Sequence, residues 1–377
     1  MFVISTEPII GVFTNALSIS KANHQRPTIK MQYLFSANKN LNMILYFFSS
    51  DNFLQDKQKI NGTYYNYKTE IWEKRLFPFP DVLYDRGGDI EKCYENKTNF
   101  VRSVLYKDAN IKKLNPAYIF DKWVLHEYFM KYGDMALYLP YTVRFASTKD
   151  LLDILNKSNT IYIKDRTGNR GLGVVRVIKL PSGIYEFDYC VKNQRTDYFY
   201  SFRTLVNKLN NFYKDKEPII QIAIDTLKIN DRNIDMRATV QRNAEGQLEI
   251  IAFPVRVAIE GSHITSTRTG SEVYDFKEFF RLNFNFSEKQ LQSLTAKIKK
   301  FLLITYNRVE EKFGRFGEMG IDFALDKDFN IWLIECNAKP GKDTIYLCYG
   351  NDVVSRAFSN PLQYSKFLCS FDKSNKS

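Results

Sequence analysis

Cysteine is scarce in this 377-residue chain, and no two cysteines are closely spaced. The chain has five cysteines and no Cys-x-x-Cys pair. Structural zinc sites and disulfide frameworks both need cysteines at close or regular spacing, so neither is expected here. The odd number of widely scattered cysteines indicates a reducing compartment.

Long hydrophobic runs are also missing. The longest apolar stretch, Met43 to Phe48, is far too short to cross a bilayer. The N-terminus lacks the basic segment and apolar run of a signal peptide, because Glu7 interrupts its hydrophobic residues. We therefore expect a cytoplasmic protein without a membrane span.

The positive charge is not concentrated in any tract. Lysine and arginine number 54 against 42 acidic residues, for a net charge of +12. This excess favours anionic partners such as nucleotides or an acidic peptide or polymer. Nucleic acid is a poor candidate, because the chain has no Lys/Arg-rich run and no RNA-binding aromatic motif. The length and the 44% hydrophobic content allow two or three domains with cores of their own.

Residues 1–115 have the pattern of an N-terminal α/β domain. We expect its strands at residues 9–13, 42–48 and 77–86, and Asn115-Pro116 then breaks the chain. Asp85 and Arg86 lie at the end of the third strand, where open α/β sheets tend to bind ligands, although an ordinary surface ion pair is an equal alternative.

Residues 116–371 predict a second, larger α+β domain, followed by a disordered tail at 372–377. The apolar patterns predict helices at 121–132, 149–156, 200–213 and 287–313. Strands are expected at 160–164, 174–179, 218–224, 234–240 and 248–259. A pair of helices broken at Pro361 is expected over 352–371.

A glycine-rich loop joins the strands at 160–164 and 174–179. Gly168, Gly171 and Gly173 follow Lys164, which ends the first strand. Glycines let backbone N–H groups approach phosphate oxygens, and the lysine can add a positive charge. The loop is neither a Walker A loop nor a Rossmann fingerprint, and a plain flexible hairpin is an equal alternative.

Two strands near the C-terminus carry acidic side chains among apolar ones. If residues 326–330 form the turn of a hairpin, Asp322 lies roughly opposite Glu335, and Asn337 shares a face with Glu335. Carboxylate and amide oxygens are the ligands that Mg²⁺ prefers. We expect the two carboxylates to repel each other while the site is empty.

Arginine occurs on two strands before this hairpin. Asp235 and Arg237 share a face, so they can pair with each other or address a phosphate together. Arg256 follows on the next strand and suits bidentate recognition of a phosphoryl or carboxylate group, with a structural salt bridge as the alternative. The small-residue loop after it, residues 261–271, is suited to the substrate side, and His263 is more typical of a loop residue than of a general base.

These segments occur in the order found in ATP-grasp enzymes, and the chain resembles that superfamily. Its wider sequence is similar to the YheC/YheD family, the endospore coat-associated proteins. The supporting residues include Trp72, the segment 77–82, Asn115-Pro116, Lys122-Trp123, Leu139-Pro140, the segment 255–258 and the segment 332–337. Cys336 stands where valine is more usual, and Arg86 departs from the Asn-Arg expected there.

The resemblance implies an ATP-grasp fold, in which two α+β subdomains bind ATP between them. The N-terminal domain precedes both along the chain. The lid subdomain covers about 145–220, and the metal-binding subdomain about 221–371. Lys122 and Lys164 would hold the α- and β-phosphates under the glycine loop. The segment of Gln221, Ile222, Ala223 and Ile224 would hold adenine, and Asp225 the ribose.

The implied chemistry is that of an ATP- and Mg²⁺-dependent ligase. Asp322, Glu335 and Asn337 would bind two Mg²⁺ ions, which Mn²⁺ can replace, while Arg237 and Arg256 would stabilise the transferred phosphoryl group. A carboxylate would be joined to an amine or thiol through an acyl-phosphate, on a substrate that can be linked to the spore coat. A non-catalytic nucleotide-binding coat protein and a small-molecule or polymer kinase are the alternatives.

Overall fold

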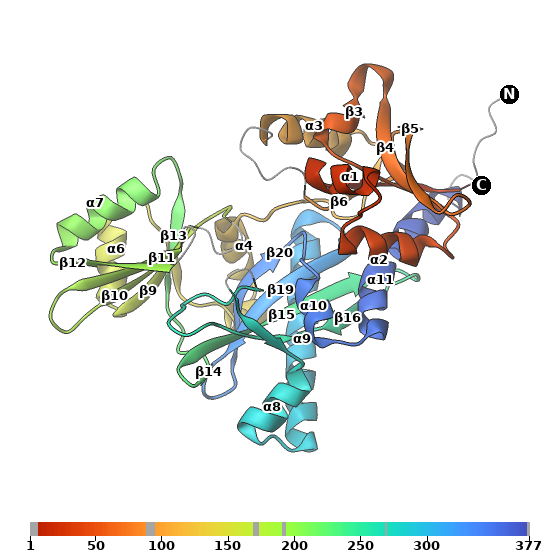
Figure 1. The fold of residues 1–377 in the computed structure, drawn as a ribbon. Coiled ribbons are helices and arrows are strands. Elements are labelled where there is room, and N and C mark those ends of the chain that lie inside the picture. Colours follow the sequence, from red (N-terminus) through yellow and green to blue (C-terminus); the bar gives the residue numbers. More distant parts are fainter. Residues whose placement is uncertain (1–6, 88–94, 169–172, 191–193, 268–269, 375–377) are drawn as a thin grey trace.

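The computed structural model describes residues 7–87, 95–168, 173–190, 194–267 and 270–374 (Figure 1). Three sheets organise these residues, two of seven strands and one of six. In Figure 1 the central sheet lies between an N-terminal unit at the upper right and a lid at the left. Among the residues described, no helix combines the length and the apolar character needed to span a membrane.

The N-terminal unit contains a mixed sheet in the order β3-β4-β2-β1-β6-β7, and β5 pairs with β4. Its strands are β1 (Ile9–Phe13), β2 (Ile44–Phe48), β3 (Phe53–Leu54), β4 (Lys59–Asn66), β5 (Ile71–Pro78), β6 (Val82–Asp85) and β7 (Lys112–Lys113). Its helices are α1 (Ala16–Asn23), α2 (Ile29–Asn38) and α3 (Glu95–Lys107). The single strand expected at 77–86 is two strands, because Pro78 and Pro80 lack the N–H groups that a ladder needs.

The lid is a six-stranded sheet in the order β12-β11-β10-β9-β13-β8, and all of its pairings are antiparallel. Its strands are β8 (Thr142–Arg144), β9 (Thr160–Asp165), β10 (Val174–Lys179), β11 (Tyr185–Cys190), β12 (Gln194–Phe199) and β13 (Pro218–Ile222). Two helices, α6 (Thr148–Leu155) and α7 (Phe202–Phe212), join its core. Ile161 and Ile163 of β9 are buried in this core, so the alternating residues Tyr162 and Lys164 point to the opposite face.

The central sheet has the order β18-β17-β15-β19-β20, and β14 and β16 also pair with β15. Its strands are β14 (Lys228–Ile229), β15 (Arg232–Arg242), β16 (Leu248–Ala252), β17 (Val255–Val257), β18 (Glu272–Tyr274), β19 (Glu318–Leu325) and β20 (Ile331–Asn337). The helices around it are α4 (Lys122–Phe129), α5 (Gly133–Ala136), α8 (Phe276–Phe284), α9 (Glu288–Phe313) and α10 (Asp343–Cys348).

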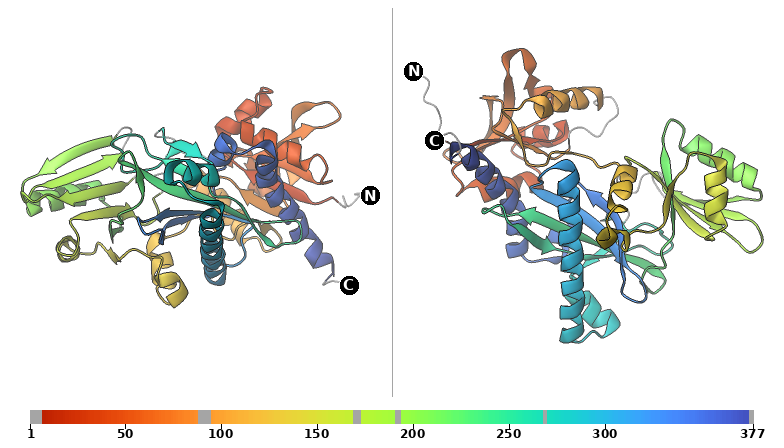
Figure 2. Two further views of the ribbon diagram at one scale, coloured as in Figure 1. Left: turned by 90° about the horizontal axis from the view of Figure 1, so that it is seen from below. Right: turned by 180° about the vertical axis from the view of Figure 1, so that it is seen from behind.

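Local side-chain bonds explain where two of these elements begin and turn. Helix α9 starts at a capping box, in which Ser287 accepts from the Gln290 backbone and Gln290 accepts from the Ser287 backbone at 2.9 Å. The turn between β19 and β20 is fixed by Asp326, whose carboxylate accepts the backbone N–H groups of Asp328 and Asn330, both at 2.9 Å. Figure 2 shows α9 running along the back of the central sheet.

The last described element is one helix, α11 (Asn351–Ser374), so the expected pair of helices was wrong. Pro361 lies inside this helix and cannot donate a hydrogen bond to the carbonyl of Ala357, four residues earlier. The side-chain amide of Gln241 on β15 donates to that carbonyl instead, at 2.9 Å. A bond from outside the helix thus replaces the missing one, and the helix continues.

Helix α11 packs against the N-terminal unit rather than standing alone. Val354, Phe358 and Leu362 belong to the same core as Ile10 and Leu45 of the N-terminal sheet. Both views in Figure 2 show the blue C-terminal helix beside the red N-terminal elements. The two ends of the described chain are therefore joined through one hydrophobic core.

Candidate functional site

A cleft of about 1430 Å³ runs between the lid, the central sheet and the N-terminal unit. Pockets for one small molecule usually measure roughly 300–1000 Å³, so this cleft has room for a nucleotide and a second ligand. All predicted site residues that the structure describes line it, with the exception of Gly173.

The acidic hairpin forms one wall of the cleft. Asp322 on β19 pairs with Glu335 on β20, next to a β-bulge between Asp322 and Phe323, which confirms the rough facing expected from the sequence. Asp322 is 3% exposed, whereas the Glu335 side chain is 23% exposed. The pair therefore has one buried and one accessible carboxylate.

Two arginines hold Asp322. Arg237 lies opposite it on β15, and its Nε donates to Asp322 Oδ1 at 2.7 Å. Arg256 Nη2 donates to Asp322 Oδ2 at 3.1 Å. Burial alone would raise the pKa of Asp322, but these guanidinium groups outweigh it and lower the pKa below its ordinary value. The expected repulsion between carboxylates does not dominate at Asp322, because this carboxylate is paired with cations.

Asp235 and Arg237 share a face of β15 but do not pair with each other. Asp235 lies opposite Arg256 across the ladder and accepts two bonds from it, both of 2.6 Å. Thr265, from the loop after β17, donates to the same carboxylate. The sequence could not give these partners, because they depend on which strands are neighbours in the sheet.

Glu335 and Asn337 form the accessible part of the acidic wall. Asn337 Nδ2 donates to Glu335 Oε1 at 3.1 Å. Two cations lie near Glu335, with Lys122 Nζ at 4.0 Å and Arg237 Nη2 at 3.9 Å. No group of three or more His, Cys, Asp and Glu residues in the described ranges is arranged to hold a metal ion. Asp322, Glu335 and the Asn337 amide oxygen are nevertheless a donor set that fits Mg²⁺ together with substrate phosphates.

Lys164 faces this wall from the lid. Its Nζ donates to Gln221 Oε1 at 2.7 Å, and the amide of Gln221 donates to Thr142 Oγ1 at 3.0 Å. Burial lowers the pKa of Lys164 to about 8, and the positive charge of Lys122 adds to the effect while Glu335 opposes it. A phosphate group beside this amine would favour its charged form.

The predicted glycines occupy different places. Gly168 lines the cleft, and its carbonyl accepts a hydrogen bond from Lys122 Nζ. Gly171 lies outside the described residues. Gly173 has a φ of +79°, a conformation that favours glycine, and its carbonyl accepts from Tyr213 on the side away from the cleft. Gly173 thus shapes the base of the loop.

The segment expected to hold adenine begins in the last two residues of β13, Gln221 and Ile222, and continues to Ile224. The backbone N–H of Ile222 donates to Tyr141 at 3.0 Å, and that of Ala223 donates to Thr160 at 3.0 Å. Within the part of the chain that the structure describes, the N–H of Ile224 makes no backbone hydrogen bond. Asp225 is exposed at the cleft edge. Ile224 therefore offers a donor that an adenine nitrogen could accept from.

Asp85 and Arg86 were expected to form either a ligand contact or a local surface pair. The surface pair is wrong, because Asp85 is buried and accepts from Arg102 Nε at 2.8 Å, whereas Arg86 binds Glu318 of the central sheet at 2.7 Å. Glu318 was not singled out from the sequence. No local pattern marks it, since its partners Tyr84 and Arg86 lie 234 and 232 positions away.

The lid sheet, the central sheet and the cleft between them define an ATP-grasp protein. Among solved structures, D-cycloserine synthetase DcsG has a TM-score of 0.57 and 10% identity, with 94% of this chain and 99% of that one covered. The ATP-grasp ligase PsnB in complex with its minimal precursor has a TM-score of 0.56 and 10% identity, with 95% and 99% covered. These likenesses confirm the expected fold.

Comparison of the sequence with known families assigns the chain to one family within the ATP-grasp proteins. The model of the YheC/D like ATP-grasp family matches residues 110–368, and the chain belongs to that family. The endospore coat-associated protein YheD of Bacillus subtilis is 22% identical over 368 residues, which cover 96% of this chain and 79% of the relative. The resemblance drawn from the motifs is thereby confirmed.

Proposed function

We propose that this protein is an ATP- and Mg²⁺-dependent ligase that joins a carboxylate to an amine or a thiol. The γ-phosphoryl group of ATP would pass to a carboxylate oxygen, and ADP would leave. The nucleophile would then attack the acyl carbon and release phosphate, which keeps that oxygen. The observation that carries the proposal is a single cleft lined by two lysines, two arginines and an acidic hairpin.

The lid side of the cleft supports binding of the nucleotide. Lys164 and Lys122 approach Glu335 from two elements, so their charges suit the α- and β-phosphates. The backbone N–H of Ile224 suits an adenine acceptor, and exposed Asp225 suits a ribose hydroxyl. Gly168 provides a backbone approach at the phosphate end.

The acidic wall supports the metal assignment. Asp322, Glu335 and Asn337 would hold Mg²⁺, which neutralises charge on the phosphates during transfer. Without nucleotide, Arg237 and Arg256 fill the place of that positive charge at Asp322. Their guanidinium groups would be available to the transferred phosphoryl group once Asp322 has another cation as its partner.

The first test is a thermal-shift titration with millimolar ATP, with and without Mg²⁺. A nucleotide that binds only the folded state raises the melting temperature by mass action. ATP with Mg²⁺ should stabilise the protein more than ATP alone, and GTP should stabilise it less. A flat titration would contradict nucleotide binding.

The second test separates the ligase from its alternatives. Phosphate release that depends on an added amine or thiol supports the ligase. A phosphorylated product that accumulates without a nucleophile supports a kinase, and binding without any consumption of ATP supports a non-catalytic coat protein. Comparing amide products by mass spectrometry in cells with and without the protein would identify the acceptor.

The substrate class and the place of action are inferred from the charge of the chain and from its relatives. The net charge of +12 favours an acidic peptide or polymer. PsnB, which shares the fold, is an ATP-grasp ligase that binds a minimal precursor. YheD is named an endospore coat-associated protein, so we propose that this chain also acts on material linked to the coat. Fractionation of spores with an antibody against the protein tests this location.

A further inference from the structure

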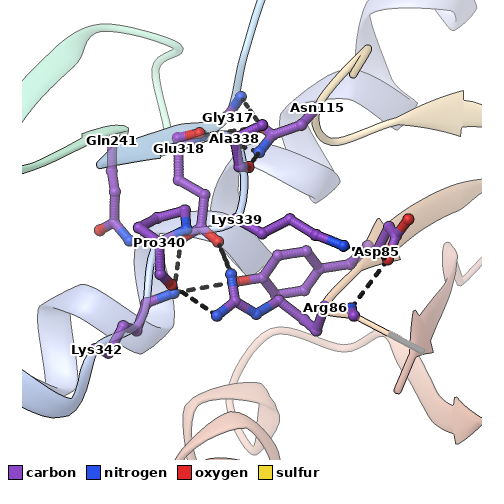
Figure 3. Close-up of polar contacts among 12 residues, drawn as sticks. Asp85, Arg86, Asn115, Gln241, Gly317, Glu318, Ala338, Lys339, Pro340 and Lys342 are labelled. Carbon is purple, nitrogen blue, oxygen red and sulfur yellow. Dashed lines mark hydrogen bonds and ion pairs between the residues drawn. The ribbon is translucent and has the colours of Figure 1, made fainter. Parts of the chain in front are cut away.

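A second buried carboxylate, Glu318, lies on the same strand as the predicted metal ligand Asp322. Glu318 begins β19 and shares a strand face with Asp322, four residues later. It is fully buried, and both of its oxygens are hydrogen-bonded (Figure 3). Oε1 accepts from the hydroxyl of Tyr84 and from Arg86 Nη1, both at 2.7 Å. Oε2 accepts from Lys342 Nζ at 2.6 Å and from Gln241 Nε2 at 3.0 Å.

These five residues, named here the Glu318 cluster, come from four separate parts of the chain. Tyr84 lies in β6 and Arg86 directly follows it, Gln241 belongs to β15, Glu318 to β19, and Lys342 to the segment after β20. Three charged side chains are thus removed from water together. Burying ions gains little stability compared with apolar packing, so the cluster is better explained by the geometry that it fixes.

The cluster anchors the segment directly after the predicted metal ligand Asn337. Arg86 Nη2 donates to the carbonyl of Pro340 at 2.7 Å, and Lys342 is anchored through its own ammonium group. Asn115 adds a third anchor, because its amide donates to the carbonyl of Ala338 as well as to that of Glu318. The chain is therefore held at residues 338, 340 and 342.

The residues between these anchors face the cleft. Lys339 and Gly341 both line it, and the ammonium group of Lys339 lies 3.9 Å from Asp85 of the N-terminal unit. Figure 3 shows Lys339 reaching toward Asp85, across the cluster from Lys342. Residues 338–342 thus connect the C-terminal end of β20 to the N-terminal unit along the wall of the cleft.

We infer that the Glu318 cluster is a positioning device for the active site. Glu318, Arg86 and Lys342 fix the segment 338–342, and with it Asn337, against the end of β6. The N-terminal unit thereby sets the geometry of the acidic wall without contacting the reacting atoms. This inference rests on the proposed function, because it assigns Asn337 to the metal.

The test compares Glu318→Gln with Glu310→Gln in the full chain. Glu310 is a matched control, because it accepts from Arg242 Nη2 at 2.6 Å and its side chain is 12% exposed, yet it does not line the cleft. Arg86→Lys is the second variant, since it keeps the charge but loses the fork that bridges Glu318 and Pro340. It also preserves the test if Glu318→Gln does not fold.

Two measurements are made on each variant. The first is the rate of native-state tryptic cleavage after Lys342, which is 2% exposed and so protected while the segment is anchored. The second is the affinity for ATP with and without Mg²⁺. We expect Glu318→Gln and Arg86→Lys to speed the cleavage and to reduce the Mg²⁺-dependent part of the affinity about tenfold, as loss of groups that orient metal ligands does. Glu310→Gln should leave both nearly unchanged.

Unchanged cleavage in Glu318→Gln and Arg86→Lys, or equal changes in Glu310→Gln, would overturn the inference. The two hypotheses can also be separated. If the wild-type protein does not bind Mg²⁺-ATP, the proposed function fails, and the cleavage rates alone then decide whether the cluster positions the segment.

Discussion

Asp322 lies between two guanidinium groups, and this position determines what its neutralisation should cost. Asp322→Asn keeps the size of the side chain but leaves Arg256, which is 3% exposed, with one carboxylate fewer. We expect a loss of about 3 kcal/mol in the free energy of unfolding of the nucleotide-free protein, because a buried ion loses a partner. Denaturant unfolding measures this loss.

The same variant should also lose the Mg²⁺-dependent part of ATP binding, which calorimetry measures. Asp188→Asn is a matched control in the lid, since Asp188 is buried and accepts from Arg176 Nε at 2.8 Å. It should lose stability without losing the Mg²⁺ effect. A stability loss in Asp322→Asn with unchanged Mg²⁺-ATP affinity would contradict the metal assignment.

Lys164 should make ATP binding depend on pH. Its pKa is lowered by burial to about 8, and phosphates beside it would raise that pKa again. Binding near or above pH 8 should therefore take up a proton, and affinity should fall as pH rises further. Calorimetry in buffers of different ionisation enthalpy measures the uptake.

Lys164→Met is the control, because it removes the titrating amine and should abolish this proton uptake. In the nucleotide-free protein, the unfolded state binds more protons than the folded state between about pH 8 and the ordinary lysine pKa of about 10.4. Lys164 alone therefore makes the free energy of unfolding rise with pH in that window. Equal uptake in the wild type and in Lys164→Met would assign the proton to another group.

The sequence predicted the acidic wall because a hairpin is local. The turn at residues 326–330 pairs Phe323 with Leu333, and a β-bulge between Asp322 and Phe323 then shifts the register by one residue, so that Asp322 faces Glu335. The spacing along the chain therefore predicted this facing only roughly. The pairing of Asp235 with Arg256 was not predictable in the same way. It requires knowing that β17 and β19 lie on the two sides of β15.

At the scale of elements, one side chain joins a helix of the lid to its sheet. Tyr213 follows α7, is 4% exposed, and its hydroxyl lies 2.8 Å from the carbonyl of Ile163 and 2.9 Å from that of Gly173. Tyr213→Phe should cost about 1–2 kcal/mol of stability, because the buried hydrogen bond that this hydroxyl donates is lost. Denaturant unfolding checks this value.

Tyr200→Phe is the comparison for that variant, since Tyr200 is 80% exposed and its change should stay within about 0.5 kcal/mol. A similar cost in both variants would mean that the Tyr213 hydroxyl does not join the helix to the sheet.

Most long elements could be predicted from periodicity, whereas those with polar or broken patterns could not. The expected helix at 287–313 corresponds to α9, which has caps at both ends. The lid strands β11 and β12 were not expected. β12 is mostly exposed and its sequence, Gln-Arg-Thr-Asp-Tyr-Phe, is largely polar. β11 was missed although Tyr185, Phe187 and Tyr189 alternate with polar residues, a pattern that indicates a strand. β11 pairs with β10 on one side and with β12 on the other, and this pairing holds the polar strand β12 in the sheet.

At the scale of the molecule, the N-terminal unit and the last helix share one core. Removing residues 1–115 would expose Val354, Phe358 and Leu362 and would leave Glu318 without Tyr84 and Arg86. We expect the remaining fragment to aggregate or to lack cooperative unfolding. Size-exclusion chromatography and circular dichroism measure both properties.

Supplying residues 1–115 as a separate polypeptide should restore a soluble complex if the shared core is the reason. A monomeric fragment that unfolds cooperatively without them would show that the N-terminal unit is dispensable for folding. The order of the motifs along the sequence predicted the ATP-grasp architecture, but the shared core joins residues more than 300 positions apart and has no signal in a local pattern.

The hydrogen bonds of the Gln241 amide restrict which substitutions the family can accept at positions 241 and 361. Its two protons serve two acceptors, the Glu318 carboxylate and the carbonyl that Pro361 leaves without a donor. Pro361→Ala would restore a helical N–H at that carbonyl, and Gln241 would then be needed only by Glu318. Positions 241 and 361 should therefore vary together among relatives, and a double-mutant cycle should find their effects on stability non-additive. The missing hydrogen bond in the last helix and the Glu318 cluster beside the candidate site would then share one evolutionary constraint.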